Sequence, residues 1–276
     1  MKHKEYKRVM TIAGSDPSGG AGVQADIKTI SACGCYATSA IAALVDENTM
    51  GVYGVFPVPD AFVAAQIHAI LDDIGTDAVK IGMLHSTELI RTVKTALDRY
   101  PEITDIVLDP VMVATSGDPL LEEEAVATLR DELIPKSRII TPNIPEAEIL
   151  LGRSICSQDE LPDAAAELSR LGTSVMLKAG HLYDDRLIDI LYNAETKETI
   201  YLESRRIDTV NTHGTGCTLS SAIASFLAKG NSLNDSVRLA KDYISKAIES
   251  GARYKIGKGH GPVDHFHHSC RKEAYI

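Results

Sequence analysis

The chain has few cysteines and no obvious way to pair them. Its 276 residues include five, at Cys33, Cys35, Cys156, Cys217 and Cys270. An odd, scattered set in a chain of this length does not indicate a disulfide framework. Cys33 and Cys35 are separated by one residue, which does not fit the C-x2-C spacing of zinc knuckles. The simplest setting for such a protein is a reducing compartment, so we expect it in the cytoplasm.

Long apolar runs and an excess of positive charge are also missing. No stretch of about 18 uninterrupted apolar residues occurs, so we expect no membrane span. The basic N-terminus is not followed by an apolar segment, so we expect no signal peptide. The formal net charge is -10, which argues against a nucleic acid as the main partner, because polyanions bind to basic surfaces.

Short apolar runs alternate with longer amphipathic stretches along the chain. The segments predicted as strands are residues 8–14, 37–45, 77–82, 105–112, 137–143 and 174–180, and those predicted as helices are residues 22–34, 60–74, 86–100, 121–134, 218–229 and 233–254. Alternation of this kind predicts an α/β protein with a mostly parallel sheet in three layers. Residues 186–207 are typical of a hairpin and predict a small antiparallel edge. With no long linker or internal repeat, residues 1–276 are predicted to form one domain.

Polar and chemically special residues gather just after the predicted strands. They are Gly14, Ser15, Asp16, Glu47, Asn48, Met83, Asp109, Asn143, Glu146 and Lys178. Ligands of such sheets bind beyond the carboxyl ends of the strands. We therefore expect these residues to converge on one rim that holds the functional site.

A glycine-rich stretch follows the first predicted strand. Residues 20–25 fit the dinucleotide-binding pattern G-x-G-x-x-A, and acidic Asp46 and Glu47 follow at a suitable distance. In that pattern the first glycine ends the strand, whereas here the six residues GSDPSG intervene. A longer loop over a small molecule is the better interpretation. The alternative is that these glycines serve only the turn.

The P-loop pattern G-x-x-x-x-G-K-[ST] is absent from the sequence, so the phosphates of a nucleotide would need another binding site. A second glycine-rich stretch, HGTGCTLSSAI, can provide such an anion-binding site. Gly214 and Gly216 leave room for backbone N–H groups to converge, and a helix beginning near Cys217 adds unpaired N–H groups. This arrangement would stabilise charge on a transferring phosphoryl group. It would also lower the pKa of Cys217. The alternative is that Cys217 is a small buried apolar residue.

Asn143 and Glu146 are three residues apart around Pro145, which is expected to open a helix at its first position. An amide and a carboxylate there can hold Mg²⁺ through water. The same pattern fits a capping box, and the sequence leaves both interpretations open. Asp109 is a plausible second acid, and Lys178 could neutralise phosphate, although each could equally be a solvated charge. His265 and His268 near the C-terminus could bind a metal, but terminal histidines are more often surface residues.

Seven motifs follow one another in order and together span nearly the whole chain: TIAGSDPSGGAGVQADIKT, KIGML, LDPVMVATSGDPLL, ITPNIPEAEIL, LKAGH, NTHGTGCTLSSAIA and GHGPVDHFH. The chain resembles the hydroxymethylpyrimidine and phosphomethylpyrimidine kinases of thiamine biosynthesis, in the ribokinase-like superfamily. The closing motif favours them over the related pyridoxine kinases. The resemblance implies a ribokinase-like three-layer α/β/α sandwich and ATP- and Mg²⁺-dependent phosphorylation of 4-amino-5-hydroxymethyl-2-methylpyrimidine and then of its monophosphate. A kinase for pyridoxine, pyridoxal or pyridoxamine, or one enzyme for both, is the alternative. The family usually dimerises, so a homodimer is expected.

The resemblance also implies roles for individual residues. Ribokinase-like enzymes carry an aspartate base after the G-x-G anion hole, and this branch resembles the one with cysteine there. Cys217 would then act as the base, beside phosphoryl-stabilising N–H groups of Gly214, Thr215 and Gly216. The residues implied for the pyrimidine pocket are Gly14, Asp26, Glu47, Met83 and Val111. Those implied for Mg²⁺ and the ATP phosphates are Asp109, Asn143, Glu146 and Lys178, with Asp109 and Glu146 as metal ligands.

Glu47 departs from the family, which often has glutamine at this position. Glutamine donates and accepts hydrogen bonds, whereas an ionised glutamate only accepts. Glu47 could accept from the exocyclic amine of an aminopyrimidine. It would serve a pocket that needs a donor poorly, unless it were protonated.

Overall fold

The computed structural model describes residues 5–112, 121–122, 124–180 and 186–269. Within these residues, nine strands form one sheet in the order β3-β2-β1-β4-β5-β6-β7-β8-β9. The six strands from β2 to β7 in this order run parallel to one another, and β3, β8 and β9 pair antiparallel. The α/β architecture, its mostly parallel sheet and the antiparallel hairpin edge predicted from the sequence are confirmed. The organisation into one domain stays a prediction.

The strands are short in the centre of the sheet and long at its edges. Their bounds are β1 Arg8–Gly14, β2 Tyr36–Asn48, β3 Gly51–Pro57, β4 Ala78–Ile81, β5 Ile106–Leu108, β6 Ile139–Ile140, β7 Ser174–Leu177, β8 Arg186–Asn193 and β9 Glu198–Arg205. Strand β4 and the three after it are wholly buried, which explains their continuous apolar runs.

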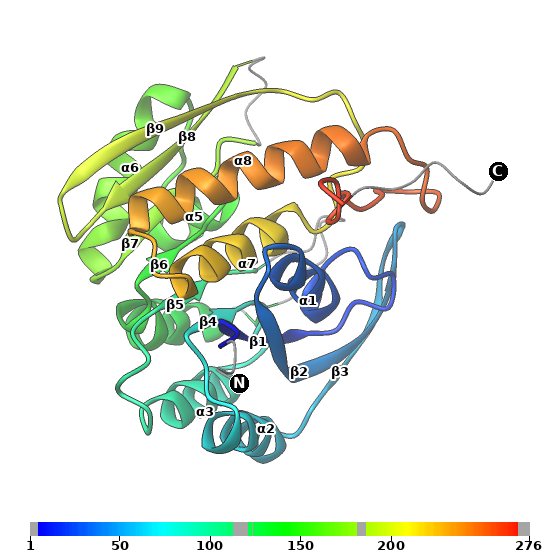
Figure 1. The fold of residues 1–276 in the computed structure, drawn as a ribbon. Coiled ribbons are helices and arrows are strands. Elements are labelled where there is room, and N and C mark those ends of the chain that lie inside the picture. The colour runs from blue at the N-terminus through cyan, green and yellow to red at the C-terminus, as the bar shows by residue number, and fades with distance from the viewer. Residues whose placement is uncertain (1–4, 113–120, 123, 181–185, 270–276) are drawn as a thin grey trace.

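Helices cover both faces of the sheet, giving three layers (Figure 1). One face is covered by α2 Asp60–Asp73, α3 Thr87–Leu97, α4 Ala125–Thr128, α5 Ile144–Leu151 and α6 Leu161–Leu168, and the other by α1 Gly22–Ala32, α7 Thr215–Ala228 and α8 Leu233–Gly251. Helix α7 lies between the sheet and α8, and its small alanine and serine side chains permit that close approach. No helix in the described ranges combines the length and the apolar character needed to span a membrane.

Three details differ from the sequence prediction. Strand β3 was not predicted; it pairs antiparallel with β2, so the sheet has an antiparallel strand at each edge. The helix predicted over residues 121–134 is interrupted: α4 is followed by a π-helical turn at Leu129–Leu133, and the acidic run precedes the helix. Pro145 occupies the second position of α5, after Ile144, because Asn143 is the cap.

Candidate active site

A cavity of about 640 Å³ lies beyond the carboxyl ends of the central parallel strands. Of the residues that the resemblance assigned to the site, all but Asp26 line it: Gly14, Glu47, Met83, Asp109, Val111, Asn143, Glu146, Lys178, Gly214, Thr215, Gly216 and Cys217. Asp16 and Asn48, which were expected on the same rim, do not line the cavity. The volume is in the range of pockets for small molecules. The strand-end rule therefore located the pocket, and the sheet brings together segments that lie far apart in the sequence.

The glycine-rich turn before α7 is held closely against the first glycine-rich loop. Gly214 caps α7 with φ +78°, and a Cβ atom there would lie 1.8 Å from the carbonyl oxygen of Gly20. A Cβ atom on Gly216 would lie 3.2 Å from Asp109 Oδ2 and 3.3 Å from Lys178 Nζ. The turn thus depends on glycine for its left-handed backbone and for its approach to both neighbours. Helix α7 begins at Thr215, two residues before Cys217, so the N–H groups of its first turn are at the cavity wall.

Cys217 is partly exposed in the cavity. Burial raises the pKa of its thiol to about 12, Asp26 and Asp109 add to the rise, and Lys80 opposes it. The expectation that the helix start would lower this pKa is therefore wrong. Loss of hydration and two nearby carboxylates outweigh the helix start and the lysine, so Cys217 is a neutral thiol at rest.

Asp26 lies behind the cavity wall. Its side chain is fully buried and paired with the equally buried Lys80, with 2.9 Å between Lys80 Nζ and Asp26 Oδ2. Thr11 Oγ1 donates to Asp26 Oδ2 at 2.6 Å, and Ser221 Oγ donates to Oδ1 at 2.7 Å. With its oxygens engaged in this way, Asp26 is not among the lining residues, contrary to the prediction. Sequence reasoning missed Lys80, although a lysine inside an apolar strand was the available signal.

Asp109 and Lys178 form a charged pair beside the glycine turn. Lys178 Nζ lies 3.3 Å from Asp109 Oδ1, and Thr141 Oγ1 donates to the same oxygen at 2.9 Å. Ser220 Oγ donates to Asp109 Oδ2 at 3.4 Å. The pair places an ammonium group and a fixed carboxylate next to the N-terminus of α7, an arrangement suited to phosphate and a divalent cation.

Asn143 and Glu146 form the capping box at the start of α5. Asn143 Oδ1 accepts from the Glu146 N–H at 2.9 Å, and Glu146 Oε2 accepts from the Asn143 N–H at 2.8 Å. Burial raises the pKa of Glu146 to about 7; Lys178 opposes the shift and Asp109 adds to it. Two buried carboxylates that face one ammonium group form an oxygen-rich set that a cation would stabilise, so the donors fit Mg²⁺. The cap and a water-mediated metal site are compatible, because each carboxylate oxygen has two lone pairs.

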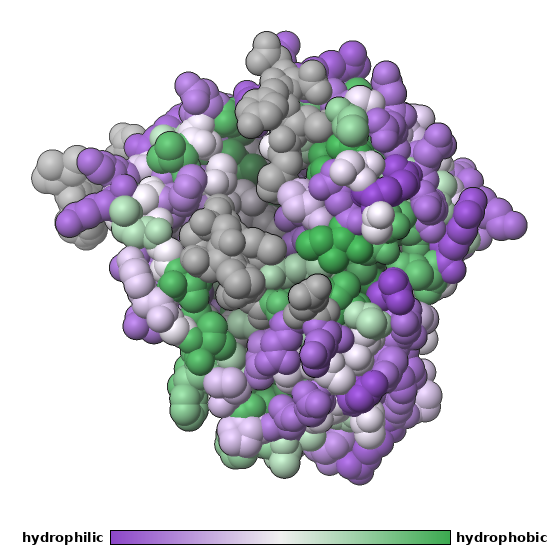
Figure 2. Space-filling model, turned by 180° about the vertical axis from the view of Figure 1, so that it is seen from behind, coloured by the Kyte–Doolittle hydropathy of each residue, from purple (hydrophilic) through white to green (hydrophobic). Residues whose placement is uncertain are grey.

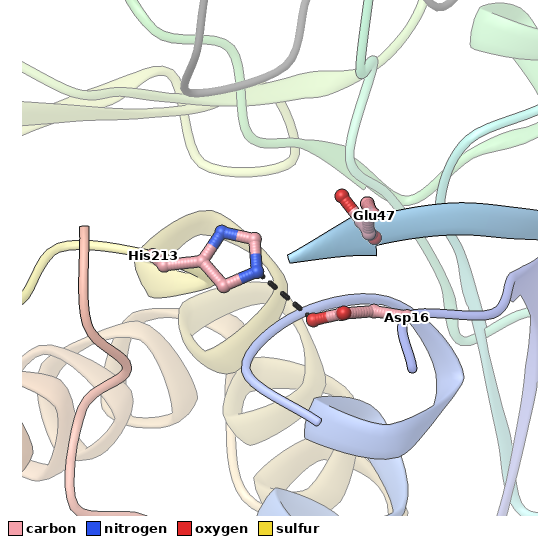
Figure 3. A group of neighbouring side chains, drawn as sticks. All are labelled: Asp16, Glu47 and His213. Carbon is pink, nitrogen blue, oxygen red and sulfur yellow. Dashed lines mark hydrogen bonds and ion pairs between the residues drawn. The ribbon is translucent and has the colours of Figure 1, made fainter. Parts of the chain in front are cut away.

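The other end of the cavity has an apolar wall and one polar cluster. Val45 and Met83 pack together with Val111 in a small cluster next to Gly14. Beside it, Glu47 lies with Asp16 and His213, and the ligand atoms of these three side chains are within 4.8 Å of one another (Figure 3). His213 was missed by the sequence reasoning, although it lies inside the motif that was quoted. Such a wall suits a flat ring, with polar contacts at its edge.

The C-terminal histidines are not arranged around a common point. His265 Nε2 lies 3.2 Å from Thr218 Oγ1, whereas the rings of His267 and His268 pack near Tyr243. In the described part of the chain, a group of three potential metal ligands is found at Asp16, Glu47 and His213 and not at this tail. The expectation that these histidines are surface residues holds for His268, whereas His265 is buried. Cys270 lies outside the described residues.

Comparison with known proteins places these features in context. The model of the phosphomethylpyrimidine kinase family matches residues 16–264. The hydroxymethylpyrimidine/phosphomethylpyrimidine kinase of Escherichia coli K12 is 45% identical over 260 residues, which is 94% of this chain and 97% of that protein. A solved phosphomethylpyrimidine kinase from Clostridium difficile 630 is 42% identical with a TM-score of 0.77, covering 88% of this chain and 99% of that one. Bacillus subtilis pyridoxal kinase, solved as an ADP complex, is 35% identical with a TM-score of 0.85, covering 95% and 98%.

Proposed function

This chain belongs to the phosphomethylpyrimidine kinase family, and we propose that it uses ATP to phosphorylate 4-amino-5-hydroxymethyl-2-methylpyrimidine and then its monophosphate. The observation that carries this proposal is one cavity with two chemically different ends. Charged groups and the start of α7 form one end, and the apolar wall with Glu47 forms the other. Cys217 lies between them, where a hydroxymethyl group on a bound ring would meet a γ-phosphoryl group.

The residues divide into a phosphate end and a ring end. N–H groups at Gly214, Thr215, Gly216 and Cys217 stabilise the transferring phosphoryl group, and Lys178 balances phosphate charge. Asp109 and Glu146 would hold Mg²⁺, which supplies charge neutralisation at the phosphates when bound, and Asn143 positions Glu146 through the cap. At the ring end, Gly14, Met83 and Val111 pack on the pyrimidine. Cys217 acts as the base in its thiolate form, which receives the proton of the attacking hydroxyl and returns to the neutral thiol.

A substrate panel tests the proposal. The protein is incubated with ATP, Mg²⁺ and each of five compounds: the pyrimidine alcohol, its monophosphate, pyridoxine, pyridoxal and pyridoxamine. Product masses are then measured. We expect one phosphoryl group to be added to each pyrimidine form. ATP consumption that does not depend on any added compound would contradict the assignment.

Phosphorylation of pyridoxal or its relatives is the second candidate. It is favoured by the similarity of the whole chain to pyridoxal kinases, including one from Staphylococcus aureus solved with ADP, with a TM-score of 0.88 and 33% identity. The same panel separates the two candidates. Mass gain on pyridoxal at a kcat/KM equal to that on the pyrimidine alcohol would indicate one enzyme for both.

Glu146→Gln tests the metal role separately from the cap. Glutamine at this position keeps a capping box, so we expect little change in the free energy of unfolding. Because the variant loses one carboxylate charge, the Mg²⁺ concentration for half-maximal activity should rise about tenfold or more, the equivalent of about 1.4 kcal/mol. Mg²⁺ titration of activity and urea unfolding measure the two effects.

Asn143→Ala is the matched comparison. This substitution removes the capping side chain and leaves Glu146 in place, so the free energy of unfolding should fall by about 0.5–2 kcal/mol. An unchanged Mg²⁺ requirement in Glu146→Gln would limit Glu146 to the capping role.

We also infer a homodimer, with the sheet edge formed by β2 and β3 as its contact. The large exposed apolar side chains of these two strands are Tyr36, Leu44, Tyr53, Val55 and Phe56, and Phe62 of α2 lies close by in the sequence. Figure 2 shows hydrophobic side chains along this edge of the molecule. The hairpin edge near Asn193–Glu198, suggested by the sequence, has Tyr201 as its exposed large apolar side chain. Light scattering on the wild type and on Phe56→Asp tests the inference; a monomeric wild type would contradict it. The cytoplasmic location stays a prediction.

A further inference from the structure

Two carboxyl groups and one imidazole meet at the ring end of the cavity. Asp16 follows β1, Glu47 lies near the end of β2, and His213 precedes α7 (Figure 3). Glu47 and His213 line the cavity, while Asp16 is fully buried behind them. Because the three ligand atoms lie within 4.8 Å of one another, the cluster could in principle hold either a metal ion or a shared proton.

The hydrogen bonds of Asp16 argue against a metal ion. Its Oδ2 atom accepts from His213 Nε2 at 2.9 Å, Gly20 N at 2.9 Å, Ala21 N at 2.6 Å and Ser18 Oγ at 2.9 Å. Its Oδ1 atom accepts from Ser18 N at 2.7 Å. A cation would have to displace donors that already fill this carboxylate, and His213 Nε2 is engaged in the same network. The cluster is therefore built around a fixed anion.

The same bonds determine where the protons are. Burial alone would raise the pKa of Asp16, but the hydrogen bonds from His213, Ser18 and Ala21 hold it well below the usual range. Asp16 in turn raises the pKa of His213 against the effect of burial, so the two form an ion pair. The ligand atoms of Glu47 and Asp16 lie within 4.8 Å of each other, and two negative charges this close in a buried site are unfavourable, so one of the two carboxyl groups takes up a proton. Since Asp16 is the stabilised anion, Glu47 carries that proton.

Among the described residues, the charged groups that act on the pKa of Glu47 are Asp16 and His213. Burial, Asp16 and the opposing His213 together raise the pKa of Glu47 to about 7. From β3, the residue paired with Glu47 is Val52, which is apolar. Gly259 donates its N–H to Thr49, which follows β2. The next residue, His260, has its imidazole hydrogen-bonded to the carbonyl oxygen of Val210. Asp109 and Lys178, which also line the cavity, belong to the phosphate end.

We propose that Glu47 recognises the substrate ring as a carboxylic acid, and that the buried Asp16–His213 ion pair positions it in that form. The inference rests on the proposed function. The O–H donates to a ring nitrogen while the carbonyl oxygen accepts from the neighbouring amino group, so the acid supplies the donor and acceptor that a glutamine would supply. Asp16 has five donors of its own, so the Glu47 O–H is free to donate to the ring. Pyridoxal and pyridoxine lack an amino group beside a ring nitrogen, so this contact selects aminopyrimidines.

The test is the pH dependence of substrate binding in the wild type and in Glu47→Gln. If Glu47 must be protonated, the wild-type KM for the pyrimidine alcohol is constant below about pH 7. Above that, it rises about tenfold per pH unit, because each binding event then takes up one proton. Glutamine does not titrate, so the KM of the Glu47→Gln variant should stay constant from pH 6.5 to 9. Calorimetry at pH 8.5 in buffers of different ionisation enthalpy should show uptake of about one proton by the wild type and none by the variant.

His213→Gln provides a second, independent variant. Removing the imidazolium leaves Asp16 without its counter-charge, so Glu47 holds its proton more firmly and the rise in KM should begin at a higher pH. Parallel KM profiles for wild type and Glu47→Gln, or an unmoved profile in His213→Gln, would overturn the proposal. Failure of the proposed function looks different: the wild type would then not phosphorylate the pyrimidine at any pH.

Discussion

Replacement of Cys217 by alanine lowers kcat by about 10²- to 10⁴-fold, the usual contribution of a positioned base. Cys217 lies in the first turn of α7 and lines the cavity, and alanine removes its sulfur while keeping the helix. Substrate affinity should change much less. Because the pKa of the thiol is raised to about 12, wild-type kcat should also increase with pH over the neutral to alkaline range, as the thiolate fraction grows. Steady-state kinetics from pH 7 to 9 measure both effects.

Two further substitutions at this position sharpen the experiment. Cys217→Ser keeps the size and polarity of the side chain, but a hydroxyl is a far weaker acid than a thiol. The serine variant should therefore turn over as slowly as the alanine variant. Cys217→Asp introduces the base that the ribokinase-like enzymes carry here, and should recover part of the lost activity with a flatter pH profile. If the alanine variant turns over near the wild-type rate, Cys217 is only a packing residue.

Replacement of Lys80 by methionine lowers the free energy of unfolding by about 3–5 kcal/mol, because it leaves a buried carboxylate without its partner. Both side chains of the Lys80–Asp26 pair have no exposed surface. Burial alone would lower the pKa of Lys80, but the carboxylates of Asp26 and Asp109 outweigh burial and raise it, so the lysine is charged at every physiological pH. Thr11 and Ser221 can still donate to Asp26 in the variant, but they supply no charge. Urea unfolding measures the loss.

The control is the double variant Lys80→Met with Asp26→Asn. Removing both charges abolishes the uncompensated carboxylate, so most of the lost stability should return. Equal destabilisation in the single and double variants would mean that packing of the lysine chain, and not its charge, stabilises this part of the core. Because Lys80 lowers the pKa of Cys217, the single variant should also shift the rise of kcat to higher pH.

Local patterns in the sequence predicted the layers and the location of the cavity. Residues 77–82 and 174–180 are short apolar runs, and the structure shows buried parallel strands within them. Strand β3 was missed because it is largely exposed and lacks a run of buried apolar residues. Its strand conformation depends on its antiparallel pairing with β2, which its own residue pattern does not reveal. The π-helical turn at Leu129–Leu133 was missed for a similar reason, since an amphipathic pattern does not distinguish closely related helices.

The sequence by itself determined the chemical groups available and the rim on which they gather. Strand ends, glycine turns and caps are set by neighbouring residues, so Gly214, Asp109 and the Asn143–Glu146 box could be located from their motifs. Only the tertiary structure decided the protonation states and the partners. Asp16 meets His213 across 197 positions, and Asp26 meets Ser221 across 195. The pKa of Cys217 rises instead of falling because burial and two distant carboxylates act on it together. Desolvation depends on everything packed around a group, and no local pattern contains that information.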